Sequence, residues 1–534
     1  MKSSRPPLRQ LQKCLEPPTR RCHFQRRPIS TPSSQPVRRP AQTRCPQTSR
    51  TTRTAKTTTR TGTTRSICSS ISSISSSRAY ATSPVPASQL LFGQPTHETH
   101  PHLLKPGELT PGITAQEHHL RRAALMARLP AGSAVVLPAA ELRYRSGAVF
   151  YPFRQESNFL YLTGFAEPES LAVLRKLSDG DYRFYLLCRS KDPAREQWNG
   201  PWSGVDAARD VWNADETGDI ADPAAALAGA FDGVTVIYSD AARSPHGASE
   251  VALRALLKRC APHILSYEPL RPHVNELRAI KSPAEIANMR RAGQLSGRAL
   301  TAAMRREWAS EKDLAAFLEY EYQTSGLDGH AYVPVVAGGP RGLLIHYVLN
   351  QAALVPGETV LVDAGGEYGT YITDITRTWP VSGKFTAAQR DLYGAVLNVQ
   401  RSVVSLCRAS ANMTLDDLQG VTERGLAQEL GRLGFALGRG GAMRVLFPHH
   451  VGHYVGLDVH DIPGYPRSVV LREGHCVTVE PGIYVPDADD DRFPAHFRGM
   501  AVRIEDSVAV GDDNPLILTT EAVKEVADIE ALRD

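Results

Sequence analysis

Short apolar segments that end in a single acidic residue recur in the last third of the chain. Thr359-Val-Leu-Val is followed by Asp363 and two glycines, and Asp374 lies eleven residues later in a second β-rich segment. Glycine-rich turns between such strands predict a hairpin that places the two carboxylates side by side. Each acid alone is an ordinary strand-end or turn residue, so this pair becomes a candidate site only together with further ligands.

A histidine-rich segment follows, which reads Pro-His449-His450-Val-Gly-His453-Tyr-Val-Gly-Leu-Asp-Val-His460. A single histidine is usually a satisfied core or surface residue. Four within twelve positions, interleaved with glycines, are hard to explain by packing and indicate a site that uses imidazole. The segment does not contain the HExxH motif of helical zinc peptidases, so that class is not predicted.

Two later apolar segments add further charged residues. Glu480 ends Val-Thr-Val-Glu before a Pro-Gly turn, and residues 500–508 are predicted as a strand on which Arg503 and Glu505 share one face. A surface charge pair is the simple interpretation, but the opposite face is apolar, so an inward pair needs compensating charge. Four carboxylates with one imidazole suit two hard divalent cations that activate a bridging water.

The first 80 residues differ sharply in composition from the rest. They hold 17 Lys or Arg and one acid, Glu16, and are rich in Ser, Thr and Pro. Such a segment is expected to stay disordered, and its acid-poor, Arg-rich character without an apolar core predicts an organelle transit peptide. A basic arm that binds nucleic acid or an acidic partner is the alternative. Arg78-Ala-Tyr80-Ala81 resembles a two-step mitochondrial cleavage pattern, in which a first protease removes the presequence and a second peptidase then removes Tyr80, leaving Ala81 at the terminus.

The remaining 44 bases and 55 acids give the body a net charge of −11, which does not favour nucleic-acid binding. The absence of CxxC pairs in the sequence favours a reducing compartment, and no apolar run is long enough to span a membrane.

After a linker at 81–110, we expect a mixed α/β domain over 111–270, with a helix at 118–129 and strands at 133–137, 182–187 and 234–238. A capping box at Ser282-Pro-Ala-Glu285 predicts a helix start near the beginning of the second domain, 271–534.

The order Asp363, Asp374, His453, Glu480, Glu505, with the motifs GHxxGLxVH and EPGIY, resembles the dinuclear site of the pita-bread metallopeptidases. This family contains aminopeptidase P, prolidase and methionine aminopeptidase. The resemblance covers most of residues 110–530. The segment YPFRQESNFLYLTGF at 151–165 looks like the N-terminal domain of the aminopeptidase P and prolidase branch, which methionine aminopeptidases lack. The resemblance therefore implies an α/β (α+β) chain with a mixed N-terminal domain and a pita-bread catalytic domain.

The resemblance also implies roles for single residues. Asp363, Asp374 and Glu505 would chelate or bridge two metal ions, and His453 and Glu480 would each bind one. Carboxylate dominance favours manganese. The histidines that match the family's accessory positions would orient the scissile carbonyl and stabilise the tetrahedral intermediate; they are His346, His449 and His460. Arg503 and Tyr484 match supporting positions. The family commonly has glycine where His450 stands, so the choice between His449 and His450 stays open.

The implied reaction is removal of one N-terminal residue from a peptide or protein, with Glu480 as the expected proton shuttle. The leader and the Tyr80-Ala81 junction favour the mitochondrial branch, which trims bulky residues in the matrix after presequence removal, including self-processing. Xaa-Pro aminopeptidase is the alternative, because His460 and Arg503 match positions that go with proline-containing substrates. A prolidase, limited to dipeptides, is a weaker alternative. A protein-binding pseudoenzyme is also weaker, since relatives of that kind have usually lost ligands and all five are present here. This branch commonly forms homo-oligomers.

Overall fold

The computed structural model of this chain describes residues 91–240 and 247–534. The predicted presequence and its junction at Tyr80 lie outside the described residues. The division into 81–110, 111–270 and 271–534 stays a prediction. Among the helices of the described residues, none combines the length and apolar character needed to cross a membrane.

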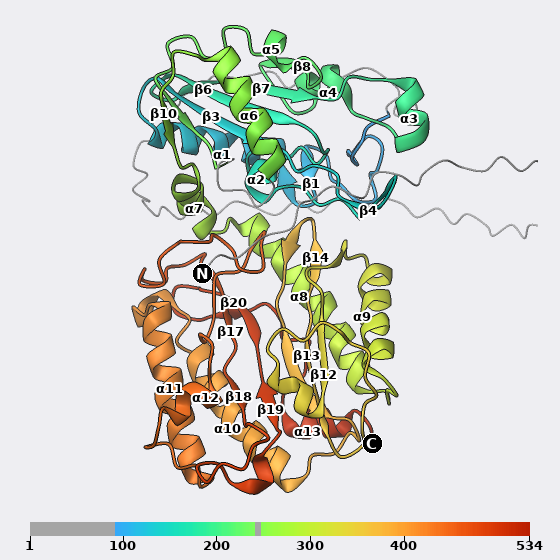
Figure 1. Ribbon diagram of the computed structural model, residues 1–534, viewed down its shortest axis with the longest axis vertical. Coiled ribbons are helices and arrows are strands. Elements are labelled where there is room, and N and C mark those ends of the chain that lie inside the picture. Colours follow the sequence, from blue (N-terminus) through green and yellow to red (C-terminus); the bar gives the residue numbers. More distant parts are fainter. Residues whose placement is uncertain (1–90, 241–246) are drawn as a thin grey trace, which may run out of the picture. The chain divides into compact units, whose positions relative to one another are not determined.

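A six-stranded mixed sheet, ordered β10-β9-β3-β6-β7-β8, organises the first part of the structure (Figure 1). Its strands are β3 (Ser133–Pro138), β6 (Leu171–Ser178), β7 (Asp181–Cys188), β8 (Glu216–Asp219), β9 (Val236–Tyr238) and β10 (Ser266–Glu268). The pairs β3–β6 and β6–β7 are antiparallel, whereas β3–β9, β9–β10 and β7–β8 are parallel. The predicted strands at 133–137, 182–187 and 234–238 are confirmed as β3, β7 and β9.

Helices and short hairpins surround this sheet. The predicted helix at 118–129 is confirmed as α1 (Ala115–Arg128), which Thr114 caps by accepting a hydrogen bond from the Glu117 amide. The other elements are β1 (Glu108–Thr110), β2 (Ile113–Thr114), β4 (Tyr144–Ser146), β5 (Val149–Phe150), α2 (Ser157–Thr163), α3 (Pro193–Asn199), α4 (Gly204–Asp210), α5 (Pro223–Ala226) and α6 (Gly247–Cys260). This mixture confirms the predicted α/β character.

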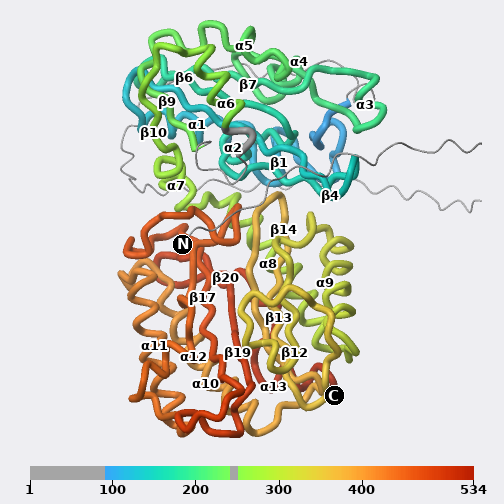
Figure 2. The backbone as a smooth tube through the Cα atoms, in the orientation of Figure 1, coloured from blue at the N-terminus to red at the C-terminus, as the bar shows by residue number. Residues whose placement is uncertain are grey.

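The C-terminal part is built from helix pairs that flank short antiparallel strands (Figure 2). After α7 (Arg271–Ala279), one side carries α8 (Pro283–Met304) and α9 (Glu311–Ser325), and the other carries α10 (Ala387–Val404), α11 (Leu415–Arg432) and α12 (Ala442–Leu446). Both bonds of the predicted capping box form at the start of α8. One apolar core, which includes Leu300, Val362, Val396 and Ile504, joins helices and strands.

The strands between these helices carry the predicted ligands. They form the sheets β12-β13-β16, β11-β14-β15, β17-β20-β21 and β18-β19. Their bounds are β11 (Gly329–His330), β12 (Val335–Gly338), β13 (Thr359–Asp363), β14 (Gly366–Tyr368), β15 (Tyr371–Ile372), β16 (Thr376–Pro380), β17 (Cys476–Val479), β18 (Gly482–Tyr484), β19 (Ala501–Arg503), β20 (Asp506–Ala509) and β21 (Leu516–Ile517). Three 3-10 turns complete this part: η3 (Gly339–Leu343), η4 (Ala409–Ala411) and η5 (Ala495–Phe497).

The prediction of one continuous strand over residues 500–508 is wrong, because the structure has two strands there, β19 and β20. β19 pairs with β18, whereas β20 pairs with β17, so the chain changes sheets between them. At this change the Ile504 amide donates to the Pro481 carbonyl and the Glu505 amide to the Thr376 carbonyl. Glu505 therefore lies at a crossing between sheets rather than inside one strand.

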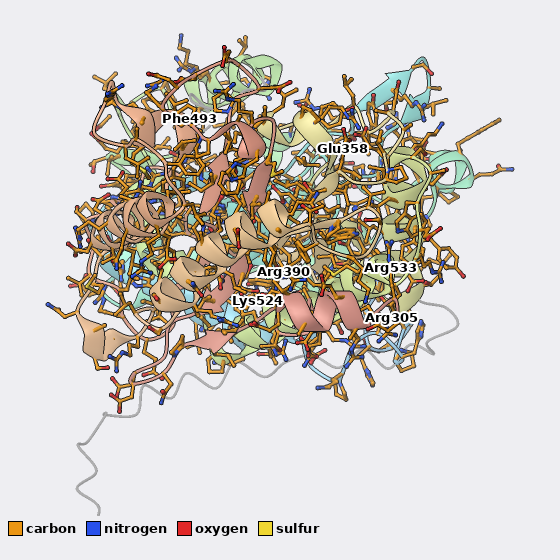
Figure 3. The ribbon with its side chains drawn as sticks, turned by 90° about the horizontal axis from the view of Figure 1, so that it is seen from below. Arg305, Glu358, Arg390, Phe493, Lys524 and Arg533 are labelled. Carbon is orange, nitrogen blue, oxygen red and sulfur yellow. The ribbon has the colours of Figure 1, made fainter. Side chains whose placement is uncertain are left out.

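The C-terminal segment contains α13 (Val526–Ala531) and contacts the ends of α8 and β16. Arg533 donates from Nε to the Met304 carbonyl at 2.7 Å and from Nη1 to the Val381 carbonyl at 2.7 Å. Arg390 of α10 donates from Nη2 to Glu530 Oε1 of α13 at 2.7 Å; Figure 3 labels Arg390 and Arg533 in the view from this end. The chain end thus ties elements from both helix pairs together.

Candidate metal centre

Two strand ends bring the predicted aspartates together. Asp363 ends β13 and pairs in register with Thr376 of β16, while Asp374 lies between β15 and β16. The Tyr332 hydroxyl lies 2.6 Å from Asp363 Oδ1 and 2.5 Å from Asp374 Oδ1. The hairpin formed by β14 and β15 connects the two strand ends, as the glycine pattern predicts.

His453 reaches the same place from the segment before β17. Its Nδ1 lies 3.0 Å from the Tyr454 carbonyl, which can only accept, so Nδ1 carries the proton. This leaves Nε2 to face the acids, 3.5 Å from Asp374 Oδ2 and 3.5 Å from Glu480 Oε1. A histidine whose second nitrogen is held by a carbonyl has the orientation typical of a metal ligand.

Glu505 completes the cluster with an oxygen that lacks a protein partner. Its Oε2 accepts a hydrogen bond from Thr376 Oγ1 at 2.6 Å. Its Oε1 is buried and has no hydrogen-bond partner among the described residues. One ligand atom each from Asp374, His453 and Glu505 lies within 4.8 Å of the others, which is the spacing of a cation site.

Negative charge exceeds positive charge in this buried cluster. Burial and the Asp374 charge raise the pKa of Asp363 to about 6 despite the opposing effect of Arg503. Burial also raises the pKa of Glu480 to about 7 and that of Glu505 well above its ordinary value. Buried carboxylates without enough cations are costly unless a metal ion compensates them. The donor set, oxygen-rich with one imidazole, therefore fits divalent cations.

A chain of hydrogen bonds leads from Asp363 to His449. Arg503 donates from Nη2 to Asp363 Oδ2 at 2.7 Å and from Nη1 to the Tyr484 hydroxyl at 2.8 Å. The Tyr484 hydroxyl then lies 2.9 Å from His449 Nε2, while His449 Nδ1 lies 2.9 Å from the His450 carbonyl. Burial, with the Arg503 charge, lowers the pKa of His449 to about 4. The ring is therefore neutral at neutral pH, with Nδ1 protonated and Nε2 accepting from Tyr484.

The sequence left open whether His449 or His450 is the accessory histidine, and the two side chains have different surroundings in the structure. His450 turns away from Tyr484: its Nδ1 lies 2.8 Å from the Gly452 carbonyl, and its Nε2 lies 3.7 Å from Asp416 of α11. His449 alone of the two joins the hydrogen-bond chain to Arg503.

The other two accessory histidines lie around the cluster. The His460 ring stands perpendicular to the His453 ring, with centroids 4.4 Å apart, and burial lowers its pKa. His346 is exposed, follows η3, and its charge contributes to lowering the pKa of both His449 and His460. His346 therefore lies within electrostatic range of both rings.

Two residues of the cluster escaped the sequence reasoning. Tyr332 touches both aspartates, yet its loop sequence, His-Ala-Tyr-Val-Pro, gives no local signal of this. Thr376 donates to Glu505 and accepts from Arg503 Nε at 2.9 Å. Strand alternation places Thr376 on the same face as Asp374 two residues earlier, and this parity could have revealed it.

The fold and this cluster define a metal-dependent peptidase with a pita-bread catalytic domain. Residues 287–512 match the model of metallopeptidase family M24, and residues 118–238 match that of the aminopeptidase P N-terminal domain. The chain belongs to metallopeptidase family M24. The predicted family and fold class are thereby confirmed, and membership implies bound divalent metal ions and peptide substrates.

Named relatives cover most of the chain. It is 43% identical over 450 residues to intermediate cleaving peptidase 55 of Saccharomyces cerevisiae, which spans 82% of this chain and 88% of that protein. It is 39% identical over 479 residues to Xaa-Pro aminopeptidase 3 of Homo sapiens, which spans 86% of this chain and 94% of that one. A crystal structure of the yeast protein lacking its first 58 residues matches with a TM-score of 0.74 and 41% identity, over 80% of this chain and 99% of that one.

Proposed function

We propose that this chain is a mitochondrial aminopeptidase that removes one bulky N-terminal residue, such as Tyr, Leu or Phe, from presequence-processing intermediates. The carboxylate-rich cluster around the unpartnered Glu505 oxygen carries the peptidase part of this proposal. The mitochondrial part is supported by the basic N-terminal segment and by the name of a further relative, intermediate cleaving peptidase 55, mitochondrial, of Arabidopsis thaliana, which is 34% identical over 461 residues. The chain would act in the matrix after losing its own presequence near Tyr80, and we keep a homo-oligomer as the expected assembly.

Five side chains would hold two divalent cations: Asp363, Asp374, His453, Glu480 and Glu505. The excess of carboxylates over imidazole favours manganese. When bound, these ions would supply positive charge to the scissile carbonyl and a nucleophilic water at neutral pH.

Glu480 is the proposed proton shuttle. Its carboxylate lies in the cluster, with Oε1 3.5 Å from His453 Nε2, so it is placed where it could accept and return the proton of an attacking water. With metals bound, Glu480→Gln would lose most turnover; near-normal turnover would rule this role out.

The accessory histidines would act on the substrate rather than on the ions. His449, held through Tyr484 and Arg503, together with His346 and His460, would orient the scissile carbonyl and stabilise the charge that develops on its oxygen. Since Tyr484 also contacts Arg503, and Arg503 contacts Asp363, the position of His449 is coupled to that of a proposed metal ligand.

Cleavage of two peptides, with manganese and with a chelator, tests the proposal. One peptide begins Tyr-Ala-Thr-Ser, the sequence of residues 80–83, and the other Tyr-Pro-Thr-Ser. Faster release of tyrosine from the first, abolished by chelator, is the expected result.

Activity confined to the proline peptide would instead make the chain an Xaa-Pro aminopeptidase, the alternative that the human relative's name supports. If neither peptide is cleaved with metals bound, a binding protein without catalytic activity is favoured.

A further inference from the structure

A buried glutamate at the start of α9 collects hydrogen bonds from the segment that carries His346. Glu311 is 0% exposed. Its Oε1 accepts from the Gly338 amide at 3.0 Å and from Arg341 Nε at 2.6 Å. Its Oε2 accepts from the Tyr347 hydroxyl at 2.8 Å and from the Ala352 amide at 2.9 Å. One carboxylate thus joins both ends and the middle of residues 338–352.

Further bonds close the same segment at its base. The Glu311 amide donates to the Ala352 carbonyl at 2.9 Å, and Arg341 Nη2 donates to the Ala353 carbonyl at 3.0 Å. Asn350, which adopts a left-handed φ of 48°, donates to the Pro334 carbonyl and accepts from the Val336 amide. A non-glycine residue at positive φ is retained when its side chain is held in this way.

The middle of the segment alternates between two faces. Leu343, Ile345 and Tyr347 are partly buried and pack against a cluster that contains Leu361 and Tyr484. The residues between and after them, Leu344, His346 and Val348, are exposed. Tyr347 is therefore packed on the Tyr484 side while its hydroxyl reaches Glu311, and this fixes the direction in which its neighbour His346 projects.

We infer that Glu311 is a positioning residue for His346, acting through Tyr347 and the closed 338–353 segment. This inference rests on the proposed function, in which His346 contacts the substrate. Glu311 itself touches none of the proposed metal ligands among the hydrogen bonds and ion pairs of the described residues.

The charge state of Glu311 agrees with this role. Burial alone would raise the pKa of its carboxyl, but hydrogen bonds from the Gly338 amide and Arg341 outweigh burial and lower the pKa. The group is therefore ionised at neutral pH and can accept from all four donors at once. An amide in its place would present its own N–H groups to donors that need an acceptor.

Two variants of different severity test the inference. Glu311→Gln keeps the size and removes the charge, whereas Tyr347→Phe removes the hydroxyl that contacts Glu311 and keeps the ring packing. Asp313→Asn is the matched control for the first, since Asp313 is exposed in the same first turn of α9. Tyr320→Phe is the matched control for the second, since Tyr320 is 64% exposed on the same helix.

Each variant is assayed in the full chain with manganese on the Tyr-Ala-Thr-Ser peptide, in the presence of His346 and in a His346→Ala background. We expect kcat to fall on the order of tenfold for Glu311→Gln and about threefold for Tyr347→Phe, because a displaced group loses its alignment with the reacting atoms. The manganese affinity of both variants and the kcat of the two control variants stay at wild-type values. In the His346→Ala background neither variant lowers kcat further.

Other outcomes overturn the inference. If both variants lower kcat by the same factor with and without His346, Glu311 acts on something else. If both variants leave kcat unchanged, Glu311 does not position His346 for catalysis. If Glu311→Gln does not fold, Tyr347→Phe alone decides. A His346→Ala variant with wild-type kcat would instead remove the proposed role of His346 itself, and that failure is visible before the double variants are made.

Discussion

Glu505 and Asp506 are neighbours in sequence, both about 1% exposed or less, and yet they lie in opposite electrostatic surroundings. Asp506 accepts from Arg377 Nη2 at 2.7 Å, from Thr519 Oγ1 at 2.7 Å and from Gln400 Nε2 at 2.8 Å, and it also pairs with Lys524. Despite burial, Arg377 and Lys524 lower the pKa of Asp506 below its ordinary value. Within residues 91–240 and 247–534, Glu505 has one donor, Thr376, and burial raises its pKa.

The difference separates a structural charge cluster from a candidate functional one. Around Asp506 the protein supplies the cations itself, so the cluster is complete without any ligand. Around Glu505 it supplies too few, and burial raises the pKa of Asp363, Glu480 and Glu505 together. A protein retains such an incomplete cluster where an external cation completes it. Substitutions at and around Glu505 and Asp506 test whether the two surroundings differ in this way.

The largest expected effect is on catalysis. Glu505→Gln should lower kcat/KM by on the order of a thousandfold, since it removes a ligand that is proposed to bridge the metals. Initial rates on the Tyr-Ala-Thr-Ser peptide measure this. The variant should unfold no more easily than the metal-free wild-type chain, because it removes a charge that the protein does not compensate. A rate within threefold of wild type would contradict the assignment.

The opposite pattern is expected one residue later. Asp506→Asn should lower the free energy of unfolding by about 3–5 kcal/mol, because Arg377 would stay buried without its partner. Denaturant unfolding of the metal-free chain measures this. A loss below about 1 kcal/mol would show that the charge cluster around Asp506 contributes little to stability.

A smaller effect is expected at the residue that supports Glu505. Thr376→Val keeps the side-chain shape but removes the hydroxyl that contacts Glu505 and Arg503. Manganese affinity should fall about 10- to 100-fold, as is typical when a residue that orients a ligand is lost. Calorimetric titration measures this. Thr378→Val is the control and should retain nearly all affinity, because the Thr378 hydroxyl bonds to the backbone carbonyl and amide of Arg503.

The smallest expected effect is on the pH dependence of stability. Burial opposes protonation of His453, but Asp374 and Glu480 raise its pKa to about 9, above the unfolded value of about 6.5. The metal-free folded state therefore binds more protons than the unfolded state, and its stability should fall by on the order of 1–2 kcal/mol from pH 6.5 to 9. Asp506→Asn should shift this curve down without changing its slope. A flat wild-type curve would contradict the prediction.

Local sequence pattern was sufficient for part of this site. Asp363 and Glu480 stand at the ends of apolar strands before glycine or proline turns, so their place at strand ends follows from short-range rules. The change of sheets at Ile504 and Glu505 did not follow, because it depends on which strands the chain meets on each side.

Long-range partners explain the rest of what the sequence could not predict. Tyr332 lies 31 and 42 residues from the aspartates that it touches, and Glu311 lies 27 to 41 residues from its four donors. No helical or strand periodicity extends over such separations. Arg377 and Asp506, separated by 129 residues, form their pair for the same reason only once both sheets are in place.

Calorimetric titration of manganese into the metal-free full-length chain at neutral pH tests the central claim most directly. We expect two ions per chain, with peptidase activity rising as they bind, and fewer than two in Glu505→Gln. A wild-type chain that cleaves peptides without bound metal, or one that binds no divalent ion at all, would contradict the account.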